Sequence, residues 1–176
     1  MSFSPDDVLS VLQSDNQPKL IQLMSNGLDP NFSLPKLPYI KDTMLLNDPP
    51  IICVAGFYGS IECLKLLLVS GALLESKDKN NIPLSNFVVA GGKVELAQVL
   101  LGYGITFDQL ISIAASYGRE NIFFWVLSNN QNDLTQVFSD QSTLLHLACS
   151  GGSCDIVRYL VEHENIDYNV TNDVLV

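Results

Sequence analysis

A glycine recurs along this chain at intervals near 33 residues, and this period restricts the possible fold more than any other feature of the sequence. The marker glycines are Gly59, Gly92, Gly118 and Gly152. They are separated by 33, 26 and 34 residues, so one unit has lost about seven residues. A second series follows the longer apolar segment of the early units and consists of Gly27, Gly71 and Gly104. Periods of roughly 20–50 residues are typical of solenoids, in which each unit contributes one supersecondary structure.

The same plan surrounds each marker glycine: a short segment of small residues, the glycine, and a longer segment with apolar residues at helical spacing. In the last copy Ile156 and Leu160 share an apolar stripe. Asp155, Arg158 and Glu162 share another stripe at i+3 and i+4 spacing, close enough to pair. One such helix pair cannot bury its own apolar face, so the pattern predicts stacked helix-turn-helix units. The copies span residues 54–78, 88–108, 113–130 and 147–169.

These segments resemble the ankyrin-repeat family, whose unit of about 33 residues is a turn and two antiparallel helices with a TPLHxA start. Residues 143–148, TLLHLA, match that start except for Leu144 in place of proline. Residues 77–84, KDKNNIPL, resemble the hairpin finger, and SGALLESKD, NGLDPN and NIDYN resemble the helix-ending segments of the family. The resemblance implies an all-α solenoid with short hairpin-like fingers.

The likeness covers nearly the whole chain as a single domain of about five units, of which the first fits least well. The units span residues 5–31, 50–80, 81–108, 109–136 and 137–172, with an insertion loop at 32–49. The histidine that usually follows the marker glycine in the family is replaced by Ser60, Lys93, Arg119 and Ser153. The last second helix keeps its apolar stripe, so either the natural chain continues past Val176 with further units or this end associates with another molecule.

The charge balance argues against nucleic acid and membrane surfaces as partners. The chain carries 9 Lys and Arg residues against 19 Asp and Glu residues, a net charge of -10. A surface of this sign repels the phosphates of nucleic acids and of anionic lipids. Hydrophobic residues make up 47% of the chain, which argues against disorder.

The N-terminal residues predict a helix start and not a secretory signal. Ser4 can cap a helix whose first residue is Pro5, and the carboxylates of Asp6 and Asp7 suit the positive end of the helix dipole. No apolar run reaches the roughly 18 residues that span a bilayer. Without an export signal the four cysteines are expected as reduced thiols, so we expect an intracellular, cytoplasmic protein.

One cluster suggests catalysis or metal binding: within ten residues stand His146, Cys149, Cys154 and Asp155. A structural zinc site needs four ligands, and the other histidine, His163, lies a helix away. Cys149 takes the position of small residues in other units, so we expect it to be buried as a small hydrophobe. The resemblance implies that His146 hydrogen-bonds near Thr143 and fixes the turn. We therefore predict no catalytic residue, no metal ligand and no cofactor. The alternative is an enzyme that uses Cys149 or Cys154 with His146.

The resemblance implies a concave face, lined by first helices and finger tips, at which partners bind. Tyrosine and phenylalanine offer much contact area at low entropic cost, so aromatic residues beside a marker glycine are candidate contacts. The alternative is that they only cover neighbouring helices. The candidates on first helices occupy the two positions before a marker glycine, and they include serines as well as aromatic residues: Phe57, Tyr58, Ser116, Tyr117 and Ser150. The candidates at a finger tip are Lys77, Lys79 and Asn80.

Two further features are candidate contact sites. Phe124 takes an outer second-helix position at which other units carry Lys65, Gln98 and Arg158. The insertion at 32–49 is either a binding loop or a tolerated surface excursion. We predict a non-enzymatic module for a protein partner of unknown identity, in an unknown oligomeric state. The alternative is a docking or regulatory segment of a longer multidomain protein or enzyme.

Overall fold

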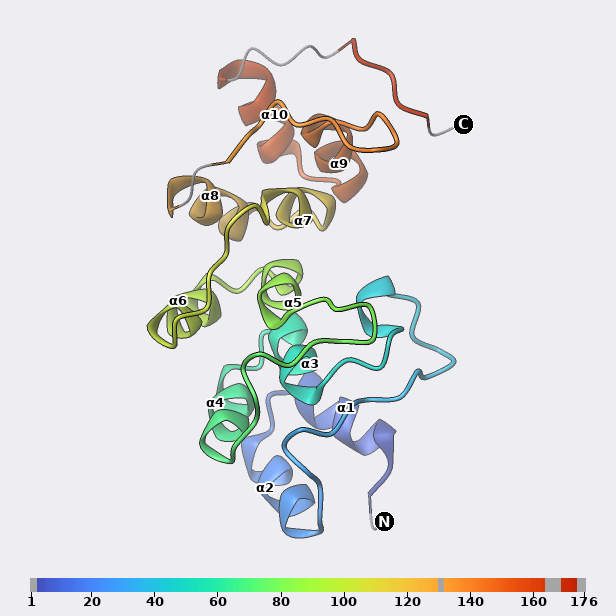
Figure 1. Ribbon diagram of the computed structural model, residues 1–176, viewed down its shortest axis with the longest axis vertical. Helices are drawn as coiled ribbons and strands as arrows, with labels where there is room; N and C mark the ends of the chain where they lie inside the picture. Colours follow the sequence, from blue (N-terminus) through green and yellow to red (C-terminus); the bar gives the residue numbers. More distant parts are fainter. Residues whose placement is uncertain (1–2, 130–131, 164–168, 174–176) are drawn as a thin grey trace. The chain divides into compact units, whose positions relative to one another are not determined.

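The computed structural model describes residues 3–129, 132–163 and 169–173, and these residues form ten α-helices, one 3-10 helix and no β-strand (Figure 1). The all-α prediction is therefore confirmed for the described chain. The helices are α1 Pro5–Gln13, α2 Gln17–Ser25, η1 Thr43–Leu45, α3 Ile51–Tyr58, α4 Ile61–Val69, α5 Leu84–Gly91, α6 Val94–Gly102, α7 Ile111–Ser116, α8 Glu120–Asn129, α9 Leu144–Gly151 and α10 Cys154–His163.

The helices follow one another as short pairs, and glycine makes the turn within each pair after the first, in which Asp15 takes the positive φ. Gly59 and Gly152 close α3 and α9 in the left-handed conformation, with φ of 69° and 75°. Glycine adopts this conformation without the steric cost of a Cβ, which explains the period in the sequence. The predicted start of α1 is confirmed, since Ser4 and Asp7 form a reciprocal capping box around Pro5.

Contacts divide the chain into two compact units, of which the first comprises the chain up to Gly91 together with Glu95–Ile105. In this unit the first helices α1, α3 and α5 pack against one another in chain order, and α2 packs against α4 (Figure 1). A Cβ on Gly91 would stand 2.5 Å from the carbonyl oxygen of Phe57, so only glycine allows α5 to approach α3 this closely. The fully buried core includes Leu12, Ile52, Val54, Leu64, Leu67 and Phe87.

The second unit comprises Gly92–Val94 and the chain from Thr106 onward. Here α7 packs against α9, and α10 contacts α8. A Cβ on Gly118 would stand 2.2 Å from the carbonyl oxygen of Gly151, so the backbones of these two repeats touch through glycine. The ring of Trp125 meets that of buried Phe107 edge-on at 5.4 Å. The remaining buried core includes Ile122, Phe123, Val126, Ala148 and Leu160.

Fingers precede three of the first helices and are closed at their bases by single β-bridges. The bridges join Ser33 to Pro50, Lys77 to Pro83, and Val137 to Thr143. The KDKNNIPL segment is therefore a finger, as predicted. The insertion lengthens the first of the three fingers, and its residues Leu34, Leu37 and Leu45 are buried. The insertion is thus anchored to the first unit by apolar contacts and is not a freely exposed loop.

Candidate functional site

In the first unit, two candidate aromatic residues close helix α3. The rings of Phe57 and Tyr58 meet edge-on, with centroids 5.2 Å apart, and both side chains are half-buried. The Tyr58 hydroxyl accepts a hydrogen bond from Nε2 of Gln13, at the end of α1, at 3.1 Å. Tyr58 thus contacts the neighbouring first helix and still offers part of its ring to a partner.

In the second unit, a hollow of about 380 Å³ lies among α7, α9 and the finger that precedes α9. Ser116 lines it from α7. Tyr117, which caps α7, is half-buried, and Ser150 is exposed on α9 outside the lining. The sequence did not single out the finger residues of the hollow. Its lining residues are Ser112, Ile113, Ser116, Phe138, Ser139, Asp140 and Leu147.

The hollow combines an apolar floor with hydroxyl groups and one carboxylate. The backbone N–H of Ser142 donates to Asp140 at 3.1 Å, and its hydroxyl donates at 2.9 Å. These hydrogen bonds hold the pKa of Asp140 below its usual value, so this carboxylate stays ionised at neutral pH. The hollow can therefore accept a side chain that carries hydrogen-bond donors or a positive charge on an apolar stem.

At the second finger tip, Lys77, Lys79 and Asn80 are all exposed. The ammonium of Lys79 pairs with Oδ2 of Asp48 at 2.5 Å, and this ion pair lowers the pKa of Asp48. The backbone N–H of Lys79 also donates to the carbonyl oxygen of Asn47 at 3.0 Å. The insertion is thereby tied to the second finger, so Lys79 already has a partner within the chain.

On the outer side of the second unit, Phe124 is 36% exposed, which confirms the predicted exposure. Its ring lies edge-on to those of Phe123 and Tyr159, each with centroids 5.3 Å away. Three aromatic rings from α8 and α10 thus form one cluster with a solvent-facing edge. The i+3 pairing predicted for α10 is also confirmed, because Arg158 contacts Asp155 at 2.9 Å.

In the cluster that suggested catalysis or metal binding, His146 makes the hydrogen bond that was predicted, whereas Cys149 is not buried as predicted. Nδ1 of His146 lies 3.1 Å from the backbone nitrogen of Thr143, which donates to it, and 2.9 Å from Oγ1 of Thr143. The turn-fixing hydrogen bond is therefore confirmed, on a ring that is half-buried. The prediction that Cys149 is buried is wrong, because Cys149 is exposed, as is Cys154. The small residues that correspond to Cys149 in earlier repeats are buried. No described helix covers the side of α9 on which Cys149 lies.

Among the described residues, no group of three or more His, Cys, Asp and Glu side chains is placed to hold a metal ion. The two remaining cysteines, Cys53 and Cys63, are buried. Burial raises the pKa of the Cys63 thiol to about 12 and raises that of Cys53 as well. Both thiols are therefore protonated at neutral pH and poor nucleophiles.

A family model described as ankyrin repeats (3 copies) matches residues 111–173. A search of solved structures agrees, with the human ASB11 ankyrin repeat domain giving a TM-score of 0.64 over 88% of this chain and 67% of that chain, at 20% identity. Residues 111–173 therefore match the ankyrin-repeat family, and the chain as a whole has the ankyrin-repeat fold. Among curated proteins, it is 32% identical over 111 residues to a "Putative ankyrin repeat protein" of Rickettsia bellii. That alignment covers 58% of this chain but 30% of the relative's length.

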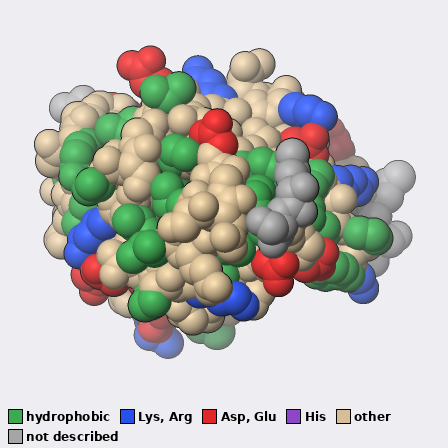
Figure 2. All heavy atoms as spheres, turned by 90° about the horizontal axis from the view of Figure 1, so that it is seen from below, with side chains coloured by type: hydrophobic (Ala, Val, Ile, Leu, Met, Phe, Trp, Pro, Cys, Tyr) green, Lys and Arg blue, Asp and Glu red, His purple; other side chains and the backbone are tan. Residues whose placement is uncertain are grey.

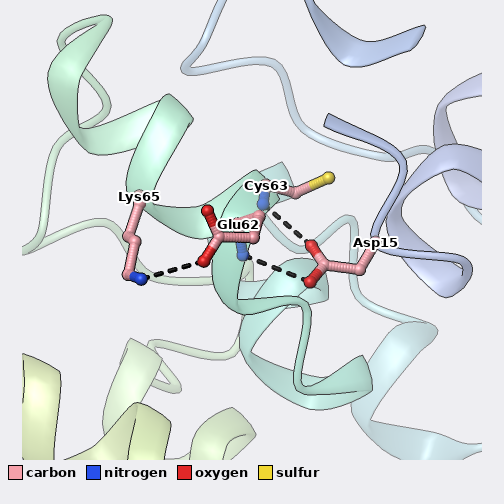
Figure 3. A network of polar contacts seen from close by, with 4 residues as sticks. All are labelled: Asp15, Glu62, Cys63 and Lys65. Atoms are coloured by element: carbon pink, nitrogen blue, oxygen red, sulfur yellow. Dashed lines mark hydrogen bonds and ion pairs between the residues drawn. The ribbon is translucent and has the colours of Figure 1, made fainter. Parts of the chain in front are cut away.

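The first two helix pairs of the first unit are joined by a cap that the sequence did not reveal. Asp15, in the turn after α1, reaches the start of α4 and accepts hydrogen bonds from the backbone N–H groups of Glu62 at 3.2 Å and Cys63 at 2.8 Å (Figure 3). Glu62 in turn pairs with Lys65 at 2.9 Å. The signal in the sequence is weak, because an Asp-Asn turn gives no indication of which helix its carboxylate caps.

The surface of this ankyrin-repeat chain is mixed in character. Figure 2 shows one face on which hydrophobic side chains are scattered among acidic and basic ones. No helix in the described parts of the chain is long and apolar enough to cross a bilayer.

Proposed function

We propose that this ankyrin-repeat chain is a non-enzymatic interaction module that binds a protein partner through its first-helix ends and finger tips. Ankyrin repeats are in general protein–protein interaction modules, and the family and fold of this chain support that assignment. The observation that carries the proposal is the hollow of about 380 Å³ in the second unit. The proposed contact residues at these places are Phe57, Tyr58, Lys77, Lys79, Asn80, Ser116, Tyr117 and Ser150, and Phe124 on the outer side of α8 is a further candidate.

The chemistry of the hollow favours a partner segment with a basic side chain next to an aliphatic one. Ile113, Phe138 and Leu147 supply apolar contact, while Asp140 supplies a negative charge at the rim. The net charge of -10 also steers basic partners toward the chain. An acidic segment would meet repulsion from both sources.

A peptide selection tests this function directly. A random peptide library displayed on phage is selected on the immobilised chain, and we expect recovered peptides to be rich in Lys or Arg beside an aliphatic residue. Ser116→Trp fills the hollow and should reduce binding of the selected peptides at least tenfold. Ser25→Trp, at an exposed serine on α2, is the matched control and should bind them as the unmodified chain does.

Three results count against the proposal. Selected peptides that bind Ser116→Trp unchanged would place the contact elsewhere, and a predominance of acidic peptides would contradict the charge argument. The third is intact capture of a partner protein by the double variant Tyr58→Ala with Tyr117→Ala. These rings supply much of the proposed contact area, so their removal should weaken capture.

A second candidate is that the chain acts as a docking or regulatory segment of a longer protein. It is favoured by the length of the curated relative, of which the alignment covers 30%. We also propose an intracellular location, because exposed thiols such as Cys149 and Cys154 persist in a reducing compartment. Fractionation with an antibody to the natural protein tests both statements, through its apparent mass and its compartment.

A further inference from the structure

The last described helix pair, α9 and α10, exposes a face, and the corresponding face of earlier repeats is buried. A groove of about 460 Å³ lies over α9 and α10. Cys149 lines it from α9, and Cys154, Val157 and Val161 line it from α10. Both thiols are exposed. The groove is thus apolar and open to solvent.

The corresponding positions of other repeats show how such a face is covered. Gly56 takes the place of Cys149 in the second repeat, and a Cβ there would stand 2.9 Å from a γ-methyl carbon of Val88 and 3.0 Å from a δ-methyl carbon of Leu84. Aliphatic side chains of a neighbouring helix therefore close this position. The residues that correspond to half-buried Val157 are all fully buried, and they are Leu64, Ala97 and Phe123.

We propose that this face binds the same face of a second copy of the chain, so that two chains form a tail-to-tail dimer with twofold symmetry. Val157 and Val161 lie one turn apart on α10 and form a ridge. Ala148 carries only a methyl group and Gly152 carries no side chain, so the α9 side of the groove is hollow. In a twofold arrangement the ridge of each copy enters the hollow of the other, which is the self-complementarity that an isologous interface requires.

The charges on the groove are self-complementary in the same arrangement. Arg158 and Glu162 both line the groove and stand one helical turn apart. When two copies of α10 cross antiparallel at a point between these residues, each Arg158 faces Glu162 of the other copy. The ion pair of Arg158 with Asp155 does not oppose this exchange, since both side chains are more than half exposed and such pairs contribute little.

Helix α1 does not fit the groove. The exposed positions of α1 are polar or acidic and comprise Asp6, Asp7, Ser10 and Gln13. Placing these residues in an apolar groove would desolvate carboxylates without a partner. Contact of this groove with helix α1 of another copy is therefore disfavoured.

Light scattering during size-exclusion chromatography over a dilution series tests the dimer. We expect the mass to rise with concentration from 19.3 kDa to twice that value. Val161→Glu should weaken association at least tenfold, while Leu101→Glu, at the corresponding and 45% exposed position of α6, should leave it unchanged. A chain that stays monomeric at every concentration, or a Val161→Glu variant that dimerises normally, overturns the proposal.

Charge reversal tests the arrangement within the dimer. Arg158→Glu and Glu162→Arg should each weaken association, because each puts like charges opposite one another, and the double variant should restore it. Single reversals without effect, or a double variant that stays as weak as the singles, would rule out the antiparallel crossing. Circular dichroism of each variant confirms that the helices are intact, so that loss of association is not loss of folding.

Discussion

The carboxylate of Asp15 accepts the backbone N–H of Cys63 at 2.8 Å, so a turn residue of the first repeat caps the second helix of the next repeat. Asp15 also accepts the backbone N–H of Glu62, and a further hydrogen bond crosses the same boundary from the hydroxyl of Ser60 to the carbonyl oxygen of Leu12. Ser60 takes the position of the histidine that the family usually carries after the marker glycine. Hydrogen bonds between residues remote in sequence thus fix the register of the first two repeats.

Asp15→Ala should lower the free energy of unfolding by about 1–2 kcal/mol, the usual cost of removing a helix cap. Asp15 also has φ of 47°, a conformation that alanine tolerates poorly. Asp15→Asn keeps one acceptor oxygen and the tolerance for this conformation, so it should lose less stability. Urea titration followed by circular dichroism measures both variants. Equal losses for alanine and asparagine would show that the carboxylate acts by charge alone.

Alanine substitutions at two helical glycines should change the stability of the chain in opposite directions. A Cβ on Gly151 would stand 2.2 Å from the carbonyl oxygen of Ala115, so Gly151→Ala should destabilise the chain by about 1–3 kcal/mol, as overpacking does. Gly102 has no neighbouring atom within 4 Å, so Gly102→Ala should stabilise the chain by about 0.5–1 kcal/mol through helix propensity. Thermal melting of the two variants separates close packing from propensity. A stabilised Gly151→Ala would show that the two backbones separate readily.

The sequence predicted the repeats because their determinants are local. A glycine with positive φ, a capping box at Ser4 and an amphipathic stripe are each visible within a few residues. Burial of Cys149 was predicted wrongly because it depends on what lies over α9, which the repeat pattern itself does not specify. The caps and ion pairs made by Asp15 and Asp48 join segments far apart in the chain, and single-sequence spacing carries no record of such pairs.

The thiols should react in two classes. In dilute solution at neutral pH, Cys149 and Cys154 should react rapidly with an aromatic disulfide reagent, because both are exposed. Cys53 and Cys63 should react only as the protein opens, since burial raises their thiol pKa. Absorbance of the released thiolate counts the fast thiols, and the double variant Cys149→Ser with Cys154→Ser should abolish the fast phase. A fast phase that survives in this variant would contradict the assigned burial.

The capping box of α1 should make stability depend on acid pH. The backbone N–H and the hydroxyl of Ser4 hydrogen-bond to Asp7 and lower its pKa below 3.8. A lowered folded-state pKa means that the stabilisation is present above the unfolded value and is lost as pH falls through the folded one. Asp7→Asn should therefore flatten the fall of the melting temperature as the pH is lowered through and below the usual pKa of an aspartate. An unchanged acid slope in this variant would remove Asp7 as a cause.

Trp125 reports whether the repeats unfold as the single domain that we propose. The indole packs on Phe107 in the second unit, so its fluorescence follows that unit, whereas circular dichroism follows the helices of both. Leu67 is fully buried in the first unit, and Leu67→Ala should cost about 2–5 kcal/mol there. In a single cooperative domain this variant also shifts the Trp125 transition, and the two probes coincide. If the units unfold independently, the Trp125 transition stays in place while the circular dichroism transition divides into two steps.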